Sequence, residues 1–366
     1  MQTGIIGLAQ AGKTSLFRIL TGARVEARGQ QPGQAHVGIA RVPDARVAKL
    51  AELFQPKKIT YATVEYVDIG GLTASKQKDR TTAGRESASL VPLREADALI
   101  HVVRLFEEPS VPRPAGSIDA MHDIESVEIE LMLNDLEQAS KRLERVEKDL
   151  KKKRDPQAEM EKAVLERCVK SLEAETPLRE LELKPDEQKL MNGFMFVSRK
   201  PMLFALNLGD EEAGEMEGAV ERHNLSKLAG KARTAVAAFC GKVEAELVDL
   251  SGAEAAELMS AYGLKEPGRD RILRASYELQ GMISFLTCGE PECRAWTIAR
   301  GTSAAKAAGA IHSDIEQHFI KAEVVGWEDL LEAGSWAAAR EKAKVRLEGR
   351  EYIVQDGDVI LFRHSG

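Results

Sequence analysis

Apolar runs and helical patterns alternate along the first third of the chain. A run at residues 4–7 ends in a glycine turn, and residues 13 to about 21 then have the periodicity of a helix. Further β-branched runs occupy 62–67 and 98–103, and a fourth, at 201–206, follows only after a long interruption. Strands separated by helical segments are typical of a parallel α/β sheet. The pattern predicts one such sheet, formed by two separate stretches of sequence.

The interruption itself has the periodicity of helices. Apolar residues recur at alternating steps of three and four positions, as in a heptad seam: Ile129, Met132, Leu136, Ala139, Leu143, Val146 and Leu150. A basic run and a proline within 151–156 break this helix, and a second stripe follows at Met160, Val164, Cys168 and Leu172. We expect an inserted antiparallel helical hairpin with the basic run at its tip. That tip is either a solvated turn or a contact for a phosphate backbone.

The last part of the chain has short strand-like runs at 282–286, 295–298 and 359–362, with a turn signal at 355–358 before the final run. These runs predict a small α+β module. The expected domains are the sheet domain at 1–123 and 200–280, the hairpin at 124–199, and the terminal module at 281–366.

Length and composition are consistent with this division. The 366 residues exceed the roughly 250 to 300 that a single core supports. A net charge of -7 with 43% hydrophobic residues excludes a uniformly basic nucleic-acid coat protein and a disordered chain. No apolar run reaches the roughly 18 residues of a membrane span. We expect a cytoplasmic monomer that contacts neither membrane nor DNA, with its four cysteines as reduced thiols.

A phosphate-binding loop follows the first predicted strand. Residues 7–14 read Gly-Leu-Ala-Gln-Ala-Gly-Lys-Thr, which has the Walker A spacing between a strand and a helix. Glycines let backbone N–H groups surround phosphates, and the helix N-terminus adds its dipole. Lys13 is expected to reach the β- and γ-phosphates, and the Thr14 hydroxyl to ligate Mg²⁺. The predicted phosphate-contacting residues are Gly7, Gln10, Ala11, Gly12, Lys13, Thr14 and Ser15.

A second motif, Asp-Ile-Gly-Gly at 68–71, ends the strand at 62–67. Its Asp-x-x-Gly form places the Asp68 carboxylate near the metal and the Gly71 amide near the γ-phosphate. Many GTPases then have a glutamine that orients the attacking water, whereas this chain has Leu72. We therefore expect hydrolysis to be slow or to depend on another group, and no catalytic residue is assigned.

Base recognition is expected from Asn207-Leu208-Gly209-Asp210, after the strand at 201–206. An Asn-Lys-x-Asp sequence would be the usual guanine-binding motif, and here Leu208 replaces the lysine. The alternative interpretation of this tetrapeptide is a plain turn between strand and loop.

These motifs together resemble the YchF family, also called Obg-like ATPases, of the translation-factor class of P-loop GTPases. The resemblance runs nearly end to end. It is carried by residues 7–14, Val-Pro-Asp-Ala-Arg at 42–46, Val-Asp-Ile-Gly-Gly-Leu at 67–72, residues 94–107, Lys-Pro-Met-Leu at 200–203, Arg-Ala-Trp-Thr-Ile at 294–298, residues 307–314 and Val-Gln-Asp-Gly-Asp-Val at 354–359.

The resemblance implies an α/β P-loop NTPase (G domain) with an inserted coiled coil and a C-terminal TGS-like, ubiquitin-like domain. It implies Mg²⁺ and ATP or GTP as ligands and the ribosome or RNA as partner. It also adds a base loop at Cys240, Gly241 and Lys242 to the predicted nucleotide-binding residues.

The chain departs from the family at several positions. The threonine of the family's switch I loop is missing from residues 31–36, and Arg113 stands at the position of a loop histidine. Asp210 replaces the family's usual glutamate, which leaves GTP as a rival to ATP. We expect a slow Mg²⁺-dependent NTPase that acts as a ribosome-associated switch. The alternative is a nucleotide-stabilised RNA- or ribosome-binding protein that does not hydrolyse its nucleotide.

Overall fold

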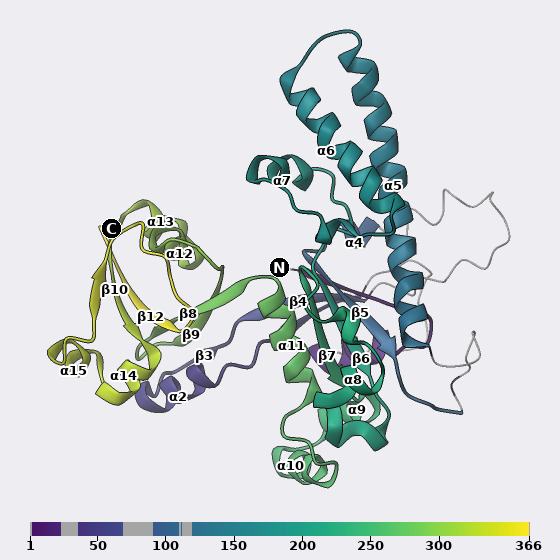
Figure 1. The fold of residues 1–366 in the computed structure, drawn as a ribbon. Coiled ribbons are helices and arrows are strands. Elements are labelled where there is room, and N and C mark those ends of the chain that lie inside the picture. The colour runs from purple at the N-terminus through teal and green to yellow at the C-terminus, as the bar shows by residue number, and fades with distance from the viewer. Residues whose placement is uncertain (1, 23–35, 69–90, 110, 112–118, 366) are drawn as a thin grey trace. The chain divides into compact units, whose positions relative to one another are not determined.

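The computed structural model describes residues 2–22, 36–68, 91–109, 111 and 119–365. The chain divides into two compact units: Met1–Ile39 with Glu65–Leu279, and Ala40–Val64 with Gln280–Gly366. Each unit contains a six-stranded sheet (Figure 1). No helix in the described ranges is long and apolar enough to cross a membrane.

The sheet of the first unit has the strand order β2-β4-β1-β5-β6-β7. Its strands are β1 (Gln2–Ile6), β2 (His36–Arg41), β4 (Thr63–Asp68), β5 (Ala98–Arg104), β6 (Met202–Asn207) and β7 (Thr234–Phe239). β1 pairs in parallel with β4 and β5, and the parallel pairing continues through β6 to β7. The predicted parallel sheet and its four predicted strands are therefore confirmed. β2 and β7 were not predicted, and β7 is rich in alanine, so it lacks a clear strand pattern.

Helices and short 3-10 turns accompany this sheet: α1 (Lys13–Thr21), α4 (Val91–Glu95), η2 (Asp210–Gly218), α8 (Ala219–Arg222), η3 (Ser226–Leu228), α9 (Gly241–Asp249), α10 (Gly252–Ala261) and α11 (Gly268–Leu279). The sheet is buried on both faces, because every residue of β5 and β6 is buried. Both strands are almost continuously apolar, as expected for the centre of a parallel sheet.

Two long helices, α5 (Ala120–Leu150) and α6 (Pro156–Glu173), follow one another between β5 and β6 and lie side by side (Figure 1). Asp119 and Asp155 begin them as N-caps, each accepting a hydrogen bond from a backbone N–H of the first turn. Their shared core includes Met132, Ala139 and Val146 from α5.

Two residues of the predicted apolar stripes are exposed. Ile129 is 39% and Met160 is 37% exposed, so their assignment to the seam was wrong. The cross-helix ion pairs Arg142–Glu161 and Lys162–Glu147 set the register between α5 and α6. In that register Ile129 lies past Glu173, the last residue of α6. Met160 lies in the first turns of α6, close to the point where the chain reverses.

A return segment connects α6 to β6 through η1 (Leu178–Glu180) and α7 (Pro185–Asn192). The buried Asp135 carboxylate on α5 holds this segment. It accepts hydrogen bonds from Val197 N at 3.0 Å, Ser198 N at 2.7 Å and Ser198 Oγ at 2.6 Å. A second buried contact joins Arg179 to Glu128 of α5 at 2.6 Å. Polar contacts therefore tie α5 to the residues that lead into the sheet.

The sheet of the second unit has the order β11-β10-β12-β8-β9-β3. Its strands are β3 (Ile59–Thr60), β8 (Met282–Cys288), β9 (Cys293–Ala299), β10 (Phe319–Gly326), β11 (Arg346–Glu348) and β12 (Asp358–His364). Its helices are α2 (Ala45–Phe54), α12 (Ala304–Ile311), α13 (Ser313–Gln317), α14 (Trp327–Ala333) and α15 (Trp336–Glu341). β8, β9 and β12 are the three strands expected in the terminal module.

Residues 40–64 belong to this second unit, although the sequence grouped them with the first domain. β3 pairs in parallel with β9, and α2 packs against β8 and β9. The Arg46 guanidinium joins the two parts of the sequence, because it contacts Asp44 and, at 2.8 Å, Asp356 in the turn before β12. The two motifs at 42–46 and 354–359 are thus one structural feature, which hydrophobic periodicity alone does not reveal.

Candidate functional site: a nucleotide cradle

The loop between β1 and α1 has a backbone that only glycine accepts at two positions. Gly7 and Gly12 have φ values of 141° and 100°. A Cβ on Gly7 would lie 2.6 Å from the carbonyl oxygen of Val102, and one on Gly12 would lie 2.4 Å from Asn207 Nδ2. Any side chain at either glycine would therefore displace the loop. The Walker A spacing thus forms the compact turn that it predicts.

Lys13 lies buried within this loop. Its Nζ donates hydrogen bonds to the carbonyl oxygens of Gly7 at 2.9 Å and Leu8 at 2.6 Å. Burial lowers the pKa of Lys13 to about 8, although the nearby Asp68 carboxylate opposes this effect. The ammonium is held where the loop surrounds it, so phosphate oxygens would be much stronger partners than the two carbonyls.

Thr14 and Asp68 meet at the start of α1. The Thr14 hydroxyl donates a hydrogen bond of 2.8 Å to Asp68 Oδ2. The other carboxylate oxygen, Oδ1, is buried and has no hydrogen-bond partner among the described residues. A hydroxyl beside an unsatisfied carboxylate oxygen fits Mg²⁺, which prefers oxygen ligands. The described ranges contain no group of three or more His, Cys, Asp or Glu side chains suited to a metal. Phosphate and water oxygens would therefore have to complete the coordination.

Asn207, at the end of β6, connects the cradle to the predicted base loop. Its Nδ2 donates to the carbonyl oxygen of Ala11 at 3.0 Å, and its Oδ1 accepts from Gly241 N at 2.9 Å. The side chain is buried, and both ends of its amide are used. Asn207 therefore fixes the position of the Walker A loop relative to the first residue of α9.

The other residues predicted to contact the base differ in whether their side chains are exposed. Leu208 and Cys240 are buried, so neither side chain can contact a base. Asp210 and Lys242 form an ion pair of 2.6 Å between exposed side chains. The hydrogen bond from Lys242 keeps the pKa of Asp210 below its usual value. Of the residues predicted to contact the base, Asp210 and Lys242 are therefore the two with exposed charged side chains.

Some of the other predicted site residues lie beside the loop, and others lie outside the described residues. Gln10 and Ser15 are exposed beside the loop, and Gln10 has a left-handed φ of 63°, which is uncommon for a residue other than glycine. Gly71 lies outside the described residues, as do Leu72, Arg113 and the part of switch I at 31–35.

The sequence did not single out His101 of β5, which is fully buried next to the cradle. Its ring packs 5.6 Å from that of Phe204. Burial, together with the smaller effect of the charges of Lys13 and Arg179, lowers the pKa of His101 to about 3. His101 is therefore neutral at physiological pH. The available signal was a single polar residue in the middle of an otherwise apolar strand.

Comparison with known proteins agrees with this geometry. Residues 2–152 match a family described as 50S ribosome-binding GTPase, and residues 282–365 match the C-terminal family of YchF GTPases, described as a protein of unknown function. The "Ribosome-binding ATPase YchF" of Bacillus subtilis is 38% identical over 100% of this chain and 99% of its own length. The protein of the same name from Haemophilus ducreyi is 37% identical over 99% and 98%.

A solved structure extends the similarity to the whole fold. The Schizosaccharomyces pombe YchF GTPase is 25% identical and aligns with a TM-score of 0.83, covering 99% of this chain and 97% of its own. The predicted family is thereby confirmed, since relatives more than 30% identical match along their full lengths. This chain is a P-loop protein and belongs to the YchF family.

Proposed function

We propose that the chain is a Mg²⁺-dependent nucleoside triphosphatase, with ATP as the preferred nucleotide, which acts in association with the ribosome. The observation that supports this proposal best is the placement of Lys13, Thr14 and Asp68 around one loop. Relatives that match the full chain carry the name "Ribosome-binding ATPase YchF".

In this proposal each residue of the cradle has one task. The Lys13 ammonium binds the β- and γ-phosphates, the Thr14 hydroxyl holds the metal, and Asp68 orients that hydroxyl. When bound, Mg²⁺ neutralises charge that develops on the phosphate oxygens. Asn207 keeps the loop at a fixed distance from the base side through its two hydrogen bonds.

The preference for ATP is supported by the ion pair on the base side. A guanine-binding carboxylate accepts hydrogen bonds from two ring donors, whereas Asp210 already accepts one from Lys242 at 2.6 Å. Binding guanine would require this contact to be broken. GTP remains the rival, because both side chains are exposed and an exposed pair contributes little.

Slow turnover is supported by the sequence, in which Leu72 stands where many GTPases have a water-orienting glutamine. The missing threonine in switch I supports the alternative, a nucleotide-stabilised ribosome-binding protein without turnover. Phosphate release measured with and without ribosomes separates the two. Release that ribosomes accelerate supports the enzyme, and no release under either condition supports the alternative.

The helices α5 and α6 are proposed to act as a coiled coil, and the second unit as a TGS-type module. The similarity of residues 282–365 to the C-terminal YchF family is consistent with the second assignment. Both would present surfaces to the ribosome, while the cradle binds the nucleotide.

Replacing Lys13 with alanine tests the nucleotide site. The variant loses charge-assisted hydrogen bonds worth about 3 kcal/mol, so we expect about 100-fold weaker ATP binding in isothermal titration. Lys152→Ala is the matched control, because that exposed lysine lies at the turn between α5 and α6 and pairs with Asp149. Wild-type affinity in Lys13→Ala would overturn the assignment. Tighter binding of GTP than ATP by the wild-type protein would reverse the base preference.

A further inference from the structure

A groove lies at the edge of the first unit's sheet where β5, β6 and β7 begin. Two neighbouring pockets form it, with volumes of about 290 and 590 Å³, and they share Asn192, Arg199 and Arg233. Lys200 comes shortly before β6, and Arg233 directly precedes β7. The Walker A loop follows the other end of β1, which runs parallel to these strands. The groove is therefore separate from the nucleotide cradle.

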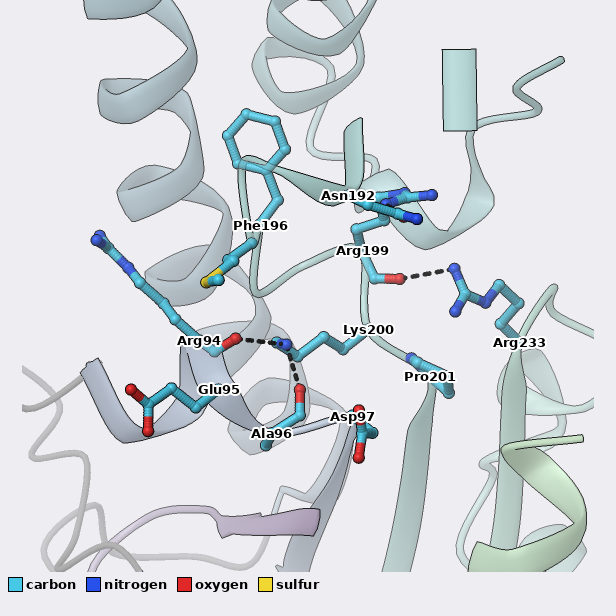
Figure 2. Close-up of a pocket in the computed structure, with 11 residues that line it drawn as sticks. Arg94, Glu95, Ala96, Asp97, Asn192, Phe196, Arg199, Lys200, Pro201 and Arg233 are labelled. Carbon is cyan, nitrogen blue, oxygen red and sulfur yellow. Dashed lines mark hydrogen bonds between the residues drawn. The ribbon is translucent and has the colours of Figure 1, made fainter. Parts of the chain in front are cut away.

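Four cations line the first pocket: Arg94, Arg199, Lys200 and Arg233. We call these four residues together with the pocket walls the cationic groove. Each donates to an uncharged oxygen. Figure 2 shows the hydrogen bonds from Arg233 to the Arg199 carbonyl at 3.0 Å and from Lys200 to the Arg94 carbonyl at 2.9 Å and to the Ala96 carbonyl. Arg94 donates to Asn134 Oδ1 at 3.2 Å, and Arg199 donates to Asn192 Oδ1 at 2.9 Å. Within the described ranges, none of the four forms an ion pair with a carboxylate.

The carboxylates of the groove are fewer than its cations. Glu95 and Asp97 lie exposed in the first pocket, and the exposed Glu182 lines the second. Asp97 already accepts a hydrogen bond from the backbone N of Gln2 at 2.8 Å. Arg179 lines the second pocket, but its charge is satisfied by Glu128. Three carboxylates therefore stand against the other four cations, and the lining of the groove keeps a net positive charge.

The surroundings lower the pKa of three of these cations. Burial lowers the pKa of Arg199 and of Lys200. Burial lowers the pKa of Arg233 too, and the charges of Arg199 and Arg179 add to that effect. Charges held near like charges and partly removed from water are stabilised by a bound anion. An arginine guanidinium has five N–H donors, and its planar fork matches the oxygens of a phosphate.

We propose that the cationic groove binds phosphate groups of a ligand other than the nucleotide in the cradle. The two adjoining pockets, which share Arg199 and Arg233, provide room for more than one phosphate. Successive phosphates of an RNA strand and a free oligophosphate have this chemistry in common. The RNA source would refine the proposed ribosome association, whereas the small-anion source is independent of it.

The test uses the full-length protein and the double variant Arg199→Gln/Arg233→Gln. Binding of a fluorescent single-stranded RNA oligonucleotide is measured by anisotropy at several salt concentrations, and binding of inorganic pyrophosphate is measured by titration calorimetry in the presence of saturating ATP. Losing two phosphate contacts should reduce the slope of log K against log salt by about 1.4. ATP affinity should stay unchanged, because the groove is separate from the cradle.

Lys227→Gln/Lys265→Gln removes two charges from exposed lysines of the first unit that do not line the groove, so this double variant is the matched control and should retain the wild-type salt slope for RNA. Arg199→Lys/Arg233→Lys preserves charge and should recover most of the binding, which guards against a folding defect.

A changed RNA slope identifies RNA as the source, and loss of pyrophosphate binding alone identifies a small oligophosphate. Equal binding of both probes by the wild-type protein and the Gln variant would overturn the inference. Ribosome pelleting of the wild-type protein and the Gln variant separates a failure of this inference from a failure of the proposed function. A wild-type protein that does not pellet with ribosomes contradicts only the proposed function.

Discussion

Lys13 makes nucleotide binding depend on pH. Its pKa of about 8 means that the buried ammonium begins to lose its proton just above neutrality. Bound phosphates favour the charged form, so nucleotide binding above pH 8 requires the uptake of a proton. ATP affinity should therefore fall about fivefold between pH 8 and pH 9. Calorimetry in buffers of different ionisation enthalpy measures the uptake directly. Lys13→Arg retains its charge and should lose this dependence, whereas an identical profile in both proteins would rule out Lys13 as the titrating group.

His101 makes the first unit sensitive to acid. Its pKa is about 3 in the folded protein and near 6.5 in the unfolded chain, so the unfolded state binds the extra proton as the pH falls below 6.5. Stability from this group is complete above pH 6.5 and decreases by about 2 kcal/mol between pH 6.5 and 5. Urea unfolding at both pH values should show a smaller loss in His101→Leu than in the wild-type protein. His122→Gln, at an exposed histidine, is the control and should behave as the wild type does.

Among the elements, α5 is attached to the return segment through two buried carboxylates, Asp135 and Glu128, and Asp135 accepts the backbone hydrogen bonds. Asp135→Ala leaves the backbone N–H groups of Val197 and Ser198 buried without their acceptor. We expect a loss of about 3 to 5 kcal/mol in the free energy of unfolding. Hydrogen exchange should show faster exchange at the two amides. Asp149→Ala removes an exposed carboxylate of the same helix and should cost less than about 0.5 kcal/mol. Unchanged protection at both amides would contradict the role given to Asp135.

The sequence predicted those elements whose apolar positions repeat strongly. The central strands and the helix after the Walker A loop were found, because burial on both faces makes such strands continuously apolar. The alanine-rich β7 and the two residues of β3 carry too little pattern to be recognised. Thr14 and Asp68 could be paired because each belongs to a motif with a known mechanism. The role of Asn207 as a tie between loops depends on distances that no motif encodes.

At the scale of the whole molecule, the sequence placed the features that are local in the chain and missed those formed by distant segments. The cationic groove takes its charges from residues 94, 199–200 and 233, and none of these segments is basic enough to be noticed alone. The second unit likewise combines residues 40–64 with the last part of the chain. Average charge and periodicity describe neighbours in sequence, and so neither could indicate these arrangements.

Residues 40–64 pack with the C-terminal part of the chain, as in the contact between Arg46 and Asp356, and this affects how the second unit folds during translation. α2 and β3 leave the ribosome early, but β8 and β9, against which they pack, follow about 220 residues later. At roughly 5 to 20 residues per second, that interval lasts about 10 to 45 seconds. Throughout it Val47, Leu50 and Ala51, which are buried in the finished protein, have no sheet to cover them. The second unit is therefore completed only after β12 has been translated. The first unit can fold earlier, while residues 40–64 are not yet packed against β8 and β9.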